Sequence, residues 1–373
     1  MKEDKEVYSI GLSILKGVDA VIVKGFAEAG IEPDEIFRLD RSELKSALGL
    51  SHTPEWCEKL ARESALAEGR RQWEQMKRHM VNALSLLDPD YPERLFEIPD
   101  PPVVIYTLGE ANLNAMHQAS VVGTRKPTPY GIKFCESLVK ELSEYFPDLS
   151  IVSGLAYGID ACAHKSSLAN NVTTIAVVAH GLNMIYPAPH RQLAKEILRK
   201  GGAIISEYRF NEKPFRQRFL ERNRIVAALS DVTVVVESDI KGGAMSTANT
   251  AFSYSREVMA LPGKITDSTS RGCNHLIRKG KAGLITCAAD LIETTGWQPE
   301  TLIIDSSKRN LFPELEGTAK IVYDTLRFQD EPVQTDRLHQ LTRIPMPQLL
   351  SLLGELEFDG VVMRHPGNRF SIS

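Results

Sequence analysis

Between residues 119 and 287 short apolar segments alternate with amphipathic ones, and this alternation constrains the fold more than any other feature. The short segments suit strands, and residues 232–237, nearly all β-branched, suit a strand buried on both faces. Strands that alternate with helices predict an α/β fold with a doubly wound, mostly parallel sheet. The predicted strands are 119–122, 150–153, 173–179, 203–206, 232–237, 258–261 and 284–287, and the predicted helices are 130–145, 158–170, 190–200, 219–229, 245–256 and 272–279.

The loops that follow the strands are the expected place for a ligand, because parallel sheets bind ligands beyond the carboxyl ends of their strands. The run Val122-Gly-Thr-Arg-Lys places a glycine, a hydroxyl and two cations between a strand and a helix, and Ser153-Gly-Leu-Ala-Tyr-Gly-Ile-Asp forms a second glycine loop. Neither is a Gly-x-Gly-x-x-Gly motif with a following acid for a ribose, which disfavours a dinucleotide enzyme.

A basic stretch precedes the strand at 232–237. Residues 209–224 carry six basic and two acidic side chains, with Phe215 and Phe219 among them. Cations interleaved with aromatic rings suit a ligand that has phosphates and flat bases, either a nucleotide or single-stranded nucleic acid. We expect Phe219, in its polar setting, to be an exposed stacking platform and Phe215 to lie in the core.

The same region offers a second anion site after the strand. Gly242 and Gly243 precede a predicted helix, and Ser246 and Thr247 add hydroxyls to its first turn. A helix N-terminus with bare backbone amides favours negative charge. The sequence therefore predicts a phosphate-binding edge on this sheet.

No catalytic or metal constellation stands out. No His-x-x-x-His pair is present, and Cys162 and His164 lie two apart on a helix, so they do not face each other. Glu207 and Glu237 end two predicted strands, where they could act as a carboxylate pair or cap the following loops. We expect no catalytic residue, no metal site and no cofactor.

The 373 residues predict more than one domain. We expect a small helical domain at 1–80, the sheet domain at 81–298, a linker at 299–312, and three helices with a hairpin at 313–373, typical of a winged helix. The last of those helices has no basic residue, which favours protein contact or packing over DNA reading. The net charge is −2 for residues 1–80, −3 for 311–373 and +1 between them, so a polyanion should bind the middle.

The cysteines and the hydropathy bear on location. The five cysteines form no Cys-x-x-Cys pair, which favours reduced thiols. No apolar run of membrane-spanning length and no secretory leader is present, so we expect a cytoplasmic protein without a membrane partner.

An ordered series of motifs from about residue 85 to 290 resembles the DNA-processing protein A (DprA/Smf) family. The series is Val122-Gly-Thr-Arg, Ser153-Gly-Leu-Ala-x-Gly-Ile-Asp, His164, Gly181-Leu-Asn-x-Ile-Tyr-Pro, Ser206-Glu, Arg222-Asn-Arg-Ile-Val-Ala, Gly243-Ala-x-x-Thr-Ala and Leu261-Pro-Gly. The resemblance implies an extended Rossmann-like domain flanked by the helical domain and the winged helix. It also implies a non-catalytic homodimer that binds single-stranded DNA and loads the RecA recombinase during natural transformation.

The resemblance also assigns positions. Residues 123–125 match the family's Gly-Ser-Arg phosphate loop with threonine in place of serine, and residues 222–224 match its Arg-Asn-Arg helix start. Tyr157 and Ala188 stand where basic residues are usual, and Gly242 replaces the usual serine. The alternative is a nucleotide-cleaving phosphoribohydrolase that uses Glu207 or Glu237. The expected DNA-binding residues are Gly123, Thr124, Arg125, Lys213, Phe219, Arg222, Asn223, Arg224, Gly242, Gly243, Ser246, Thr247 and Lys264.

Overall fold

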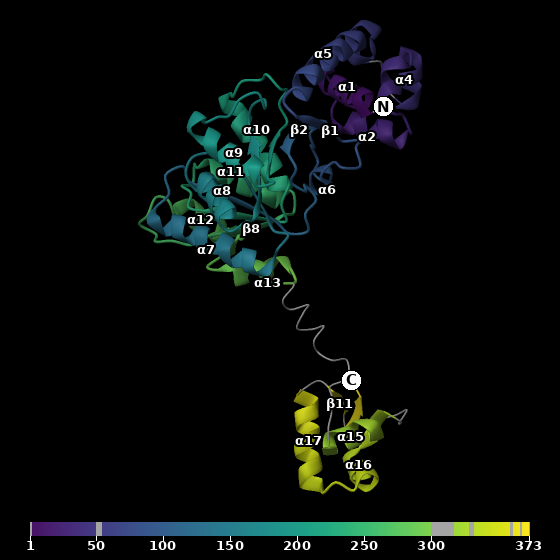
Figure 1. Ribbon diagram of the computed structural model, residues 1–373, viewed down its shortest axis with the longest axis vertical. Helices are drawn as coiled ribbons and strands as arrows, with labels where there is room; N and C mark the ends of the chain where they lie inside the picture. The colour runs from purple at the N-terminus through teal and green to yellow at the C-terminus, as the bar shows by residue number, and fades with distance from the viewer. Residues whose placement is uncertain are drawn as a thin grey trace. The chain divides into compact units, whose positions relative to one another are not determined.

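A computed structural model of the chain describes residues 2–49, 54–299, 317–327, 332–358, 361–365 and 368–372 (Figure 1). The chain divides into two compact units, Met1–Gln298 and Pro299–Ser373. Beyond residue 299, the predicted linker 299–312 lies outside the described residues.

The first unit is built on a nine-stranded sheet in the order β1-β2-β6-β5-β4-β3-β7-β8-β9. The strands from β6 to β9 in this order are parallel, while β1 pairs with β2 and β2 with β6 antiparallel. The chain winds outward from β3 through β4 and β5 to β6 and then returns to β7 on the other side of β3. The strands are β1 Asn82–Ser85, β2 Val104–Gly109, β3 Gln118–Gly123, β4 Ser150–Ser153, β5 Thr173–Val178, β6 Ala203–Ser206, β7 Val232–Val236, β8 Glu257–Ala260 and β9 Gly283–Leu284.

Helices cover both faces of the sheet, as a doubly wound fold requires (Figure 1). Apolar side chains of α10, α11 and α12 share one core with one face of the sheet, and those of α7, α8 and α13 share another with the opposite face. All five residues of β7 are buried, which confirms the prediction of a strand covered on both sides. The helices are α6 Glu93–Phe96, α7 Pro129–Tyr145, α8 Ile159–Ala169, α9 Arg191–Arg199, α10 Arg216–Ala228, α11 Gly243–Ser253, α12 Arg271–Arg278 and α13 Ala288–Thr295.

The seven predicted parallel strands are all present, but the predicted bounds of the last one, 284–287, are wrong. Strand β9 ends at Leu284, whereas the prediction extended it to Cys287. The backbone amides of Thr286 and Cys287 donate to the Asp290 carboxylate at 2.6 and 3.2 Å, and Cys287 is the N-cap of α13. Helix capping therefore takes these residues out of the strand.

The described residues up to Lys77 fold mainly into helices, and α1 and α5 pack on the sheet. Ile10 of α1 and Met76 of α5 lie in one apolar cluster with Ala83 of β1 and Tyr106 of β2. These helices therefore belong to the first compact unit. They are α1 Lys2–Ile14, α2 Ala20–Glu28, α3 Pro33–Arg38, α4 Arg41–Ala47 and α5 Lys59–Lys77, with a 3-10 turn at Glu55–Cys57.

The second unit has the predicted arrangement of three helices and a small sheet. Its antiparallel sheet has the order β10-β12-β11, and its core includes Leu338, Leu353 and Phe370. Helix α17 carries no basic residue along its length. The elements are α15 Gly317–Arg327, β10 Val333–Gln334, α16 Thr335–Thr342, α17 Met346–Phe358, β11 Val362–His365 and β12 Arg369–Ile372.

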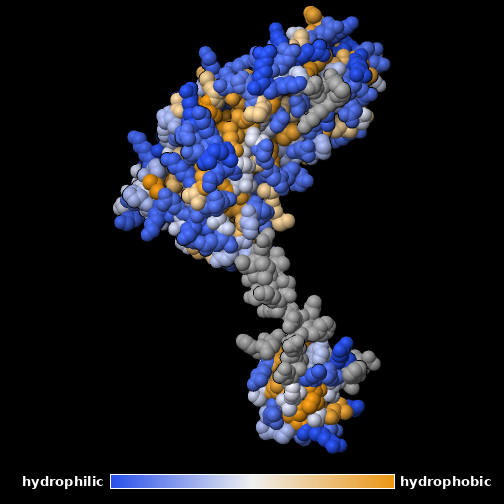
Figure 2. All heavy atoms as spheres, in the orientation of Figure 1, coloured by the Kyte–Doolittle hydropathy of each residue, from blue (hydrophilic) through white to orange (hydrophobic). Residues whose placement is uncertain are grey.

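The surface in view in Figure 2 is mostly hydrophilic, with smaller hydrophobic patches. None of the helices in the described ranges has the length and apolar character needed to cross a membrane.

Candidate nucleic-acid interface

The loop after β3 is fastened to the end of β7 by Glu237. The Thr124 amide donates to the Glu237 carbonyl at 2.7 Å, and the buried Glu237 carboxylate accepts from the amide of Thr128 at 2.8 Å and from its hydroxyl. Glu237 has a φ of +60°, a conformation that costs free energy for a side chain with a Cβ and that persists where surrounding contacts enforce it. Because Thr128 in turn caps α7, the backbone of residues 124–128 is held at several points.

The loops after β3 and β4 touch through their backbones. Gly158 has a φ of +81°, and a Cβ at this position would lie 2.2 Å from the Thr124 carbonyl oxygen. That same oxygen accepts a hydrogen bond of 3.1 Å from the amide of Ile159, the first residue of α8. Only glycine permits this approach, so the two glycine loops form one continuous surface.

Two cations project from this surface. Arg125 and Lys126 are both exposed, and their side chains make no hydrogen bond or ion pair with the residues that the structure describes. The positive charge of Arg125 has only a weak effect on the buried Asp160. It lowers the pKa of this carboxyl less than the other groups around it do. The position and availability of Arg125 suit a phosphate.

The start of α11 lies on the same edge of the sheet, after β7. Its N-cap, Gly242, has no side chain to cap the helix, and Gly243 is exposed with open space where a Cβ would be. A Cβ on Gly242 would lie 2.3 Å from the Ser238 hydroxyl, so this turn needs glycine. Asn223, in the second half of α10, donates to the Gly243 carbonyl at 3.4 Å and links α10 to the start of α11. The Met245 amide donates to the Gly242 carbonyl at 3.1 Å, which leaves the amides of Gly243 and Ala244 in this turn for an anion.

Aromatic rings stand beside these groups. Phe219, in the first turns of α10, is partly buried and not exposed as expected, because its ring packs on Tyr186 from the loop after β5, with centroids 5.7 Å apart. Phe215 lies before the helix and is 65% exposed, so the expectation that it belongs to the core is wrong. Lys213, in the preceding loop, and Lys264, in the loop after β8, are exposed.

Two family patterns match most of this chain. The pattern of the family described as "DNA recombination-mediator protein A" matches residues 82–296, and that of the "DprA winged helix domain" matches residues 309–368. Protein Smf of Synechocystis is 31% identical over 405 residues, with 99% of each chain covered. This chain belongs to the DNA recombination-mediator protein A (DprA/Smf) family.

Two solved structures of DprA proteins share the fold. The DNA processing protein A of Streptococcus pneumoniae has a TM-score of 0.64 and 29% identity, covering 78% of this chain and 97% of that one. The DNA processing protein A of Helicobacter pylori, whose structure concerns its single-stranded DNA binding mode, has a TM-score of 0.52 and 33% identity, covering 60% and 96%.

The first arginine of the Arg-Asn-Arg segment is not part of the surface. Arg222 is 4% exposed, and its guanidinium donates to the carbonyl of Gly154 at 2.7 Å and to that of Val177. It faces the buried Asp160, whose pKa is raised by burial and lowered by this arginine. The expectation of a phosphate contact from Arg222 is therefore corrected, because the side chain joins the ends of β4 and β5 from inside.

Arg224 also departs from the expectation. Its guanidinium pairs with Glu207, lies 3.5 Å from the Asp100 carboxylate and donates to the Asp100 carbonyl at 2.7 Å. Two carboxylates thus neutralise it, which disfavours the expected phosphate contact. Thr247 is corrected as well, because it is 2% exposed and belongs to the buried face of α11, whereas Ser246 is only partly buried.

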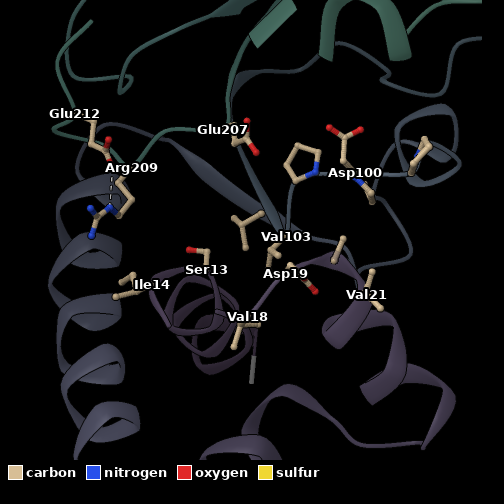
Figure 3. A pocket seen from close by; sticks show the side chains of 15 residues that line it. Ser13, Ile14, Val18, Asp19, Val21, Asp100, Val103, Glu207, Arg209 and Glu212 are labelled. Atoms are coloured by element: carbon tan, nitrogen blue, oxygen red, sulfur yellow. Dashed lines mark hydrogen bonds and ion pairs between the residues drawn. The ribbon is translucent and has the colours of Figure 1, made fainter. Parts of the chain in front are cut away.

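An acidic cavity bounds the interface on the β6 side. It has a volume of about 540 Å³ and lies between the N-terminal helices and residues 99–104 (Figure 3). Arg209 and Glu212 on its wall pair with each other at 2.7 Å. The carboxylates that line it are Asp19, Asp100, Glu207 and Glu212. These four carboxylates outnumber the three arginines that pair with them, Arg209, Arg218 and Arg224, so the net charge opposes a phosphate here. The favourable part of the edge therefore begins after Glu212, at the residues before α10, and runs to β8.

The two glutamates considered for catalysis are both engaged. Glu237 holds the loop before α7 and Glu207 holds Arg224, which agrees with the structural interpretation of these residues. Among the described residues, no group of three or more His, Cys, Asp or Glu side chains could hold a metal ion. His164 is buried, and burial lowers its pKa to about 3, so it stays neutral.

Sequence reasoning missed the residues that shape the loops and part of the aromatic surface. Glu237 and Leu155 both have a positive φ and are buried, and nothing in the sequence marks a backbone conformation of this kind. In the sequence, Tyr186 stands out only as part of the Tyr-Pro motif and Tyr157 only as a departure from the family pattern, so neither is predicted to be part of an aromatic surface.

Proposed function

We propose that this chain binds single-stranded DNA along the carboxyl edge of its sheet, from Lys213 before α10 and the loop after β5 to the loop after β8. The observation that carries the proposal is the pair of exposed cations, Arg125 and Lys126, on a loop fixed by buried hydrogen bonds beside the uncapped start of α11. A preformed site loses little conformational entropy when a flexible strand binds, which increases affinity.

The chemistry around these cations favours a single strand over a duplex. Partly exposed rings accompany the cations, and rings can stack only on bases that are not enclosed in a helix. The Helicobacter pylori relative is described as binding single-stranded DNA, which supports the same ligand here. We retain Gly123, Thr124, Arg125, Lys213, Phe219, Asn223, Gly242, Gly243, Ser246 and Lys264 as the candidate contacts.

We further propose that the protein acts in the cytoplasm as a homodimer that protects incoming single strands and delivers them to the RecA recombinase during natural transformation. We keep 1–80, 81–298, 299–312 and 313–373 as the proposed division of the chain, with the winged helix as a protein-contact or packing module. The family description as a recombination mediator supports this role. We infer that the protein is not an enzyme, because Glu207 and Glu237 are both committed to structural contacts.

Binding of a fluorescent oligonucleotide across a salt series tests the ligand and the site together. The full chain should bind single-stranded DNA more tightly than duplex DNA. Arg125→Ala should make the negative slope of log K against log salt shallower by about 0.7, the loss of one phosphate contact. Lys140→Ala is the matched control, because Lys140 is also exposed but lies about 16 Å along α7 from its first residue. Equal effects of the two variants would place the site elsewhere.

The partner roles have their own tests. Sedimentation of the full chain should give a dimer, and the protein should speed RecA filament assembly on single strands covered by a single-strand binding protein. A monomer, or an unchanged assembly rate, would remove the corresponding part of the proposal. Release of free base from a nucleoside monophosphate would favour the phosphoribohydrolase instead.

A further inference from the structure

A second pair of rings, Tyr157 and His190, stands on the carboxyl edge of the sheet. Tyr157 lies in the loop after β4 and is 46% exposed. Its ring packs edge-on against that of His190, with centroids 4.9 Å apart and an interplanar angle of 66°. His190 therefore supports the tyrosine ring, and nearly half of the residue remains exposed.

The support beneath Tyr157 is itself fixed. The His190 ring Nδ1 bonds to the carbonyl of Leu155 at 2.8 Å, and Leu155 is fully buried with a φ of +55°. A buried residue held in a rare backbone conformation indicates that the surrounding structure imposes the shape of the loop. The orientation of the Tyr157 platform is thus set by the core beneath it.

One loop connects this pair of rings to the pair already described. The loop after β5 carries Tyr186, which packs on Phe219, and four residues later it carries His190, which packs on Tyr157. The Tyr186 amide donates to Nε2 of the buried His180 at 3.1 Å, which holds the first half of the loop. The rings therefore follow one another along the edge from α10 to the loop after β4.

The ring row ends next to the phosphate candidate. Gly158 follows Tyr157 directly, and a Cβ on Gly158 would lie 2.7 Å from the backbone Cα of Arg125. A cation and an exposed ring are thus neighbours on two loops in contact. This is the arrangement that a nucleotide needs, since its phosphate and its base bind different chemical groups.

We propose that Tyr157, supported by His190, is a base-stacking platform that extends the Tyr186–Phe219 pair into one track for successive bases of single-stranded DNA. The proposal deepens the proposed function and rests on it. Tyr157 contributes through its ring and not through charge, so its contribution is independent of salt and tolerant of base identity.

The test compares an oligothymidine with an oligomer of the same length that has abasic positions throughout. Tyr157→Ala should weaken binding to oligothymidine about tenfold, the effect of one lost stacking contact, without changing the salt slope. Tyr157→Phe should bind like the wild type, because it keeps the ring. On the abasic oligomer, the wild type and Tyr157→Ala should bind equally, since no base is left to stack.

Tyr145→Ala is the control, because Tyr145 is similarly exposed but lies at the far end of α7. Melting temperatures confirm that each variant is folded. The stacking role is overturned if Tyr157→Ala binds oligothymidine like the wild type, or if it loses as much affinity for the abasic oligomer. A wild-type protein that binds no single-stranded DNA overturns the proposed function as well, so the two failures are distinguishable.

Discussion

Arg222→Ala should lower the stability of the protein and leave the salt dependence of DNA binding unchanged. The substitution removes the donor for the carbonyls of Gly154 and Val177 and takes away the cation that faces the buried Asp160. Removing one partner of a buried charge interaction costs roughly 3–5 kcal/mol. For a domain of this size that corresponds to a fall in melting temperature of roughly 6–20 °C.

The matched variant is Arg125→Ala. Arg125 and Arg222 are both cationic positions of family motifs, but one is exposed and the other is buried. Arg125 is exposed and has no partner among the described residues, so its loss should change the free energy of unfolding by less than about 0.5 kcal/mol. Thermal unfolding followed by circular dichroism and a salt series of DNA binding measure both quantities on each variant. A stable Arg222→Ala protein with a reduced salt slope would refute the assignment of Arg222 to the interior.

Three further predictions concern the scaffold of the interface. Gly154→Ala should cost about 1–3 kcal/mol of stability, because its methyl group would lie 2.6 Å from Arg222 Nη1 and 2.7 Å from Asp160 Oδ2, whereas Gly243→Ala, which meets open space, should keep the melting temperature. Glu237→Gln should lower the hydrogen-exchange protection of the Thr128 amide by weakening the bond at 2.8 Å, and unchanged protection would show that the amide is held by other contacts. Burial lowers the pKa of His164 from 6.5 to about 3, so only the unfolded state gains this proton as pH falls through that window. Stability in urea should therefore decline by at most ~1.4 kcal/mol per pH unit from this residue, and His164→Gln should reduce the decline.

The sequence predicted the fold well because hydrophobic periodicity and strand–helix alternation determine a parallel sheet almost by themselves. The β-branched run of β7 and the glycines before α8 and α11 all occupy the expected places. The edge that holds the candidate interface followed from the same alternation, because ligand loops in such a sheet lie at the carboxyl ends of the strands.

The roles of individual arginines could not be predicted in this way. Arg222 and Arg224 are two residues apart on α10, so they point in different directions from the helix, one into the core and one toward Glu207. Their fates depend on Gly154, 68 residues earlier, and on Asp100, 124 residues earlier. A local excess of positive charge therefore indicates a candidate region without identifying the side chains that meet solvent.

The charges of this edge divide into those that build the surface and those that remain available on it. Buried charged groups, above all Arg222 and Glu237, form hydrogen bonds with the backbones of the loops and so fix the positions of these loops from the interior. These bonds hold the loop of Arg125, which has no partner among the described residues, and a loop fixed in this way lowers the entropy cost of the phosphate contact that we propose. The acidic cavity at β6 disfavours DNA on that side of the interface. A DNA strand that reached Glu207 and Asp100 would meet two carboxylates that already share one arginine, Arg224. In the proposed function, attraction at the β3 loop and repulsion beyond β6 direct a DNA strand across the ring row, where we propose that bases and not phosphates make the contacts.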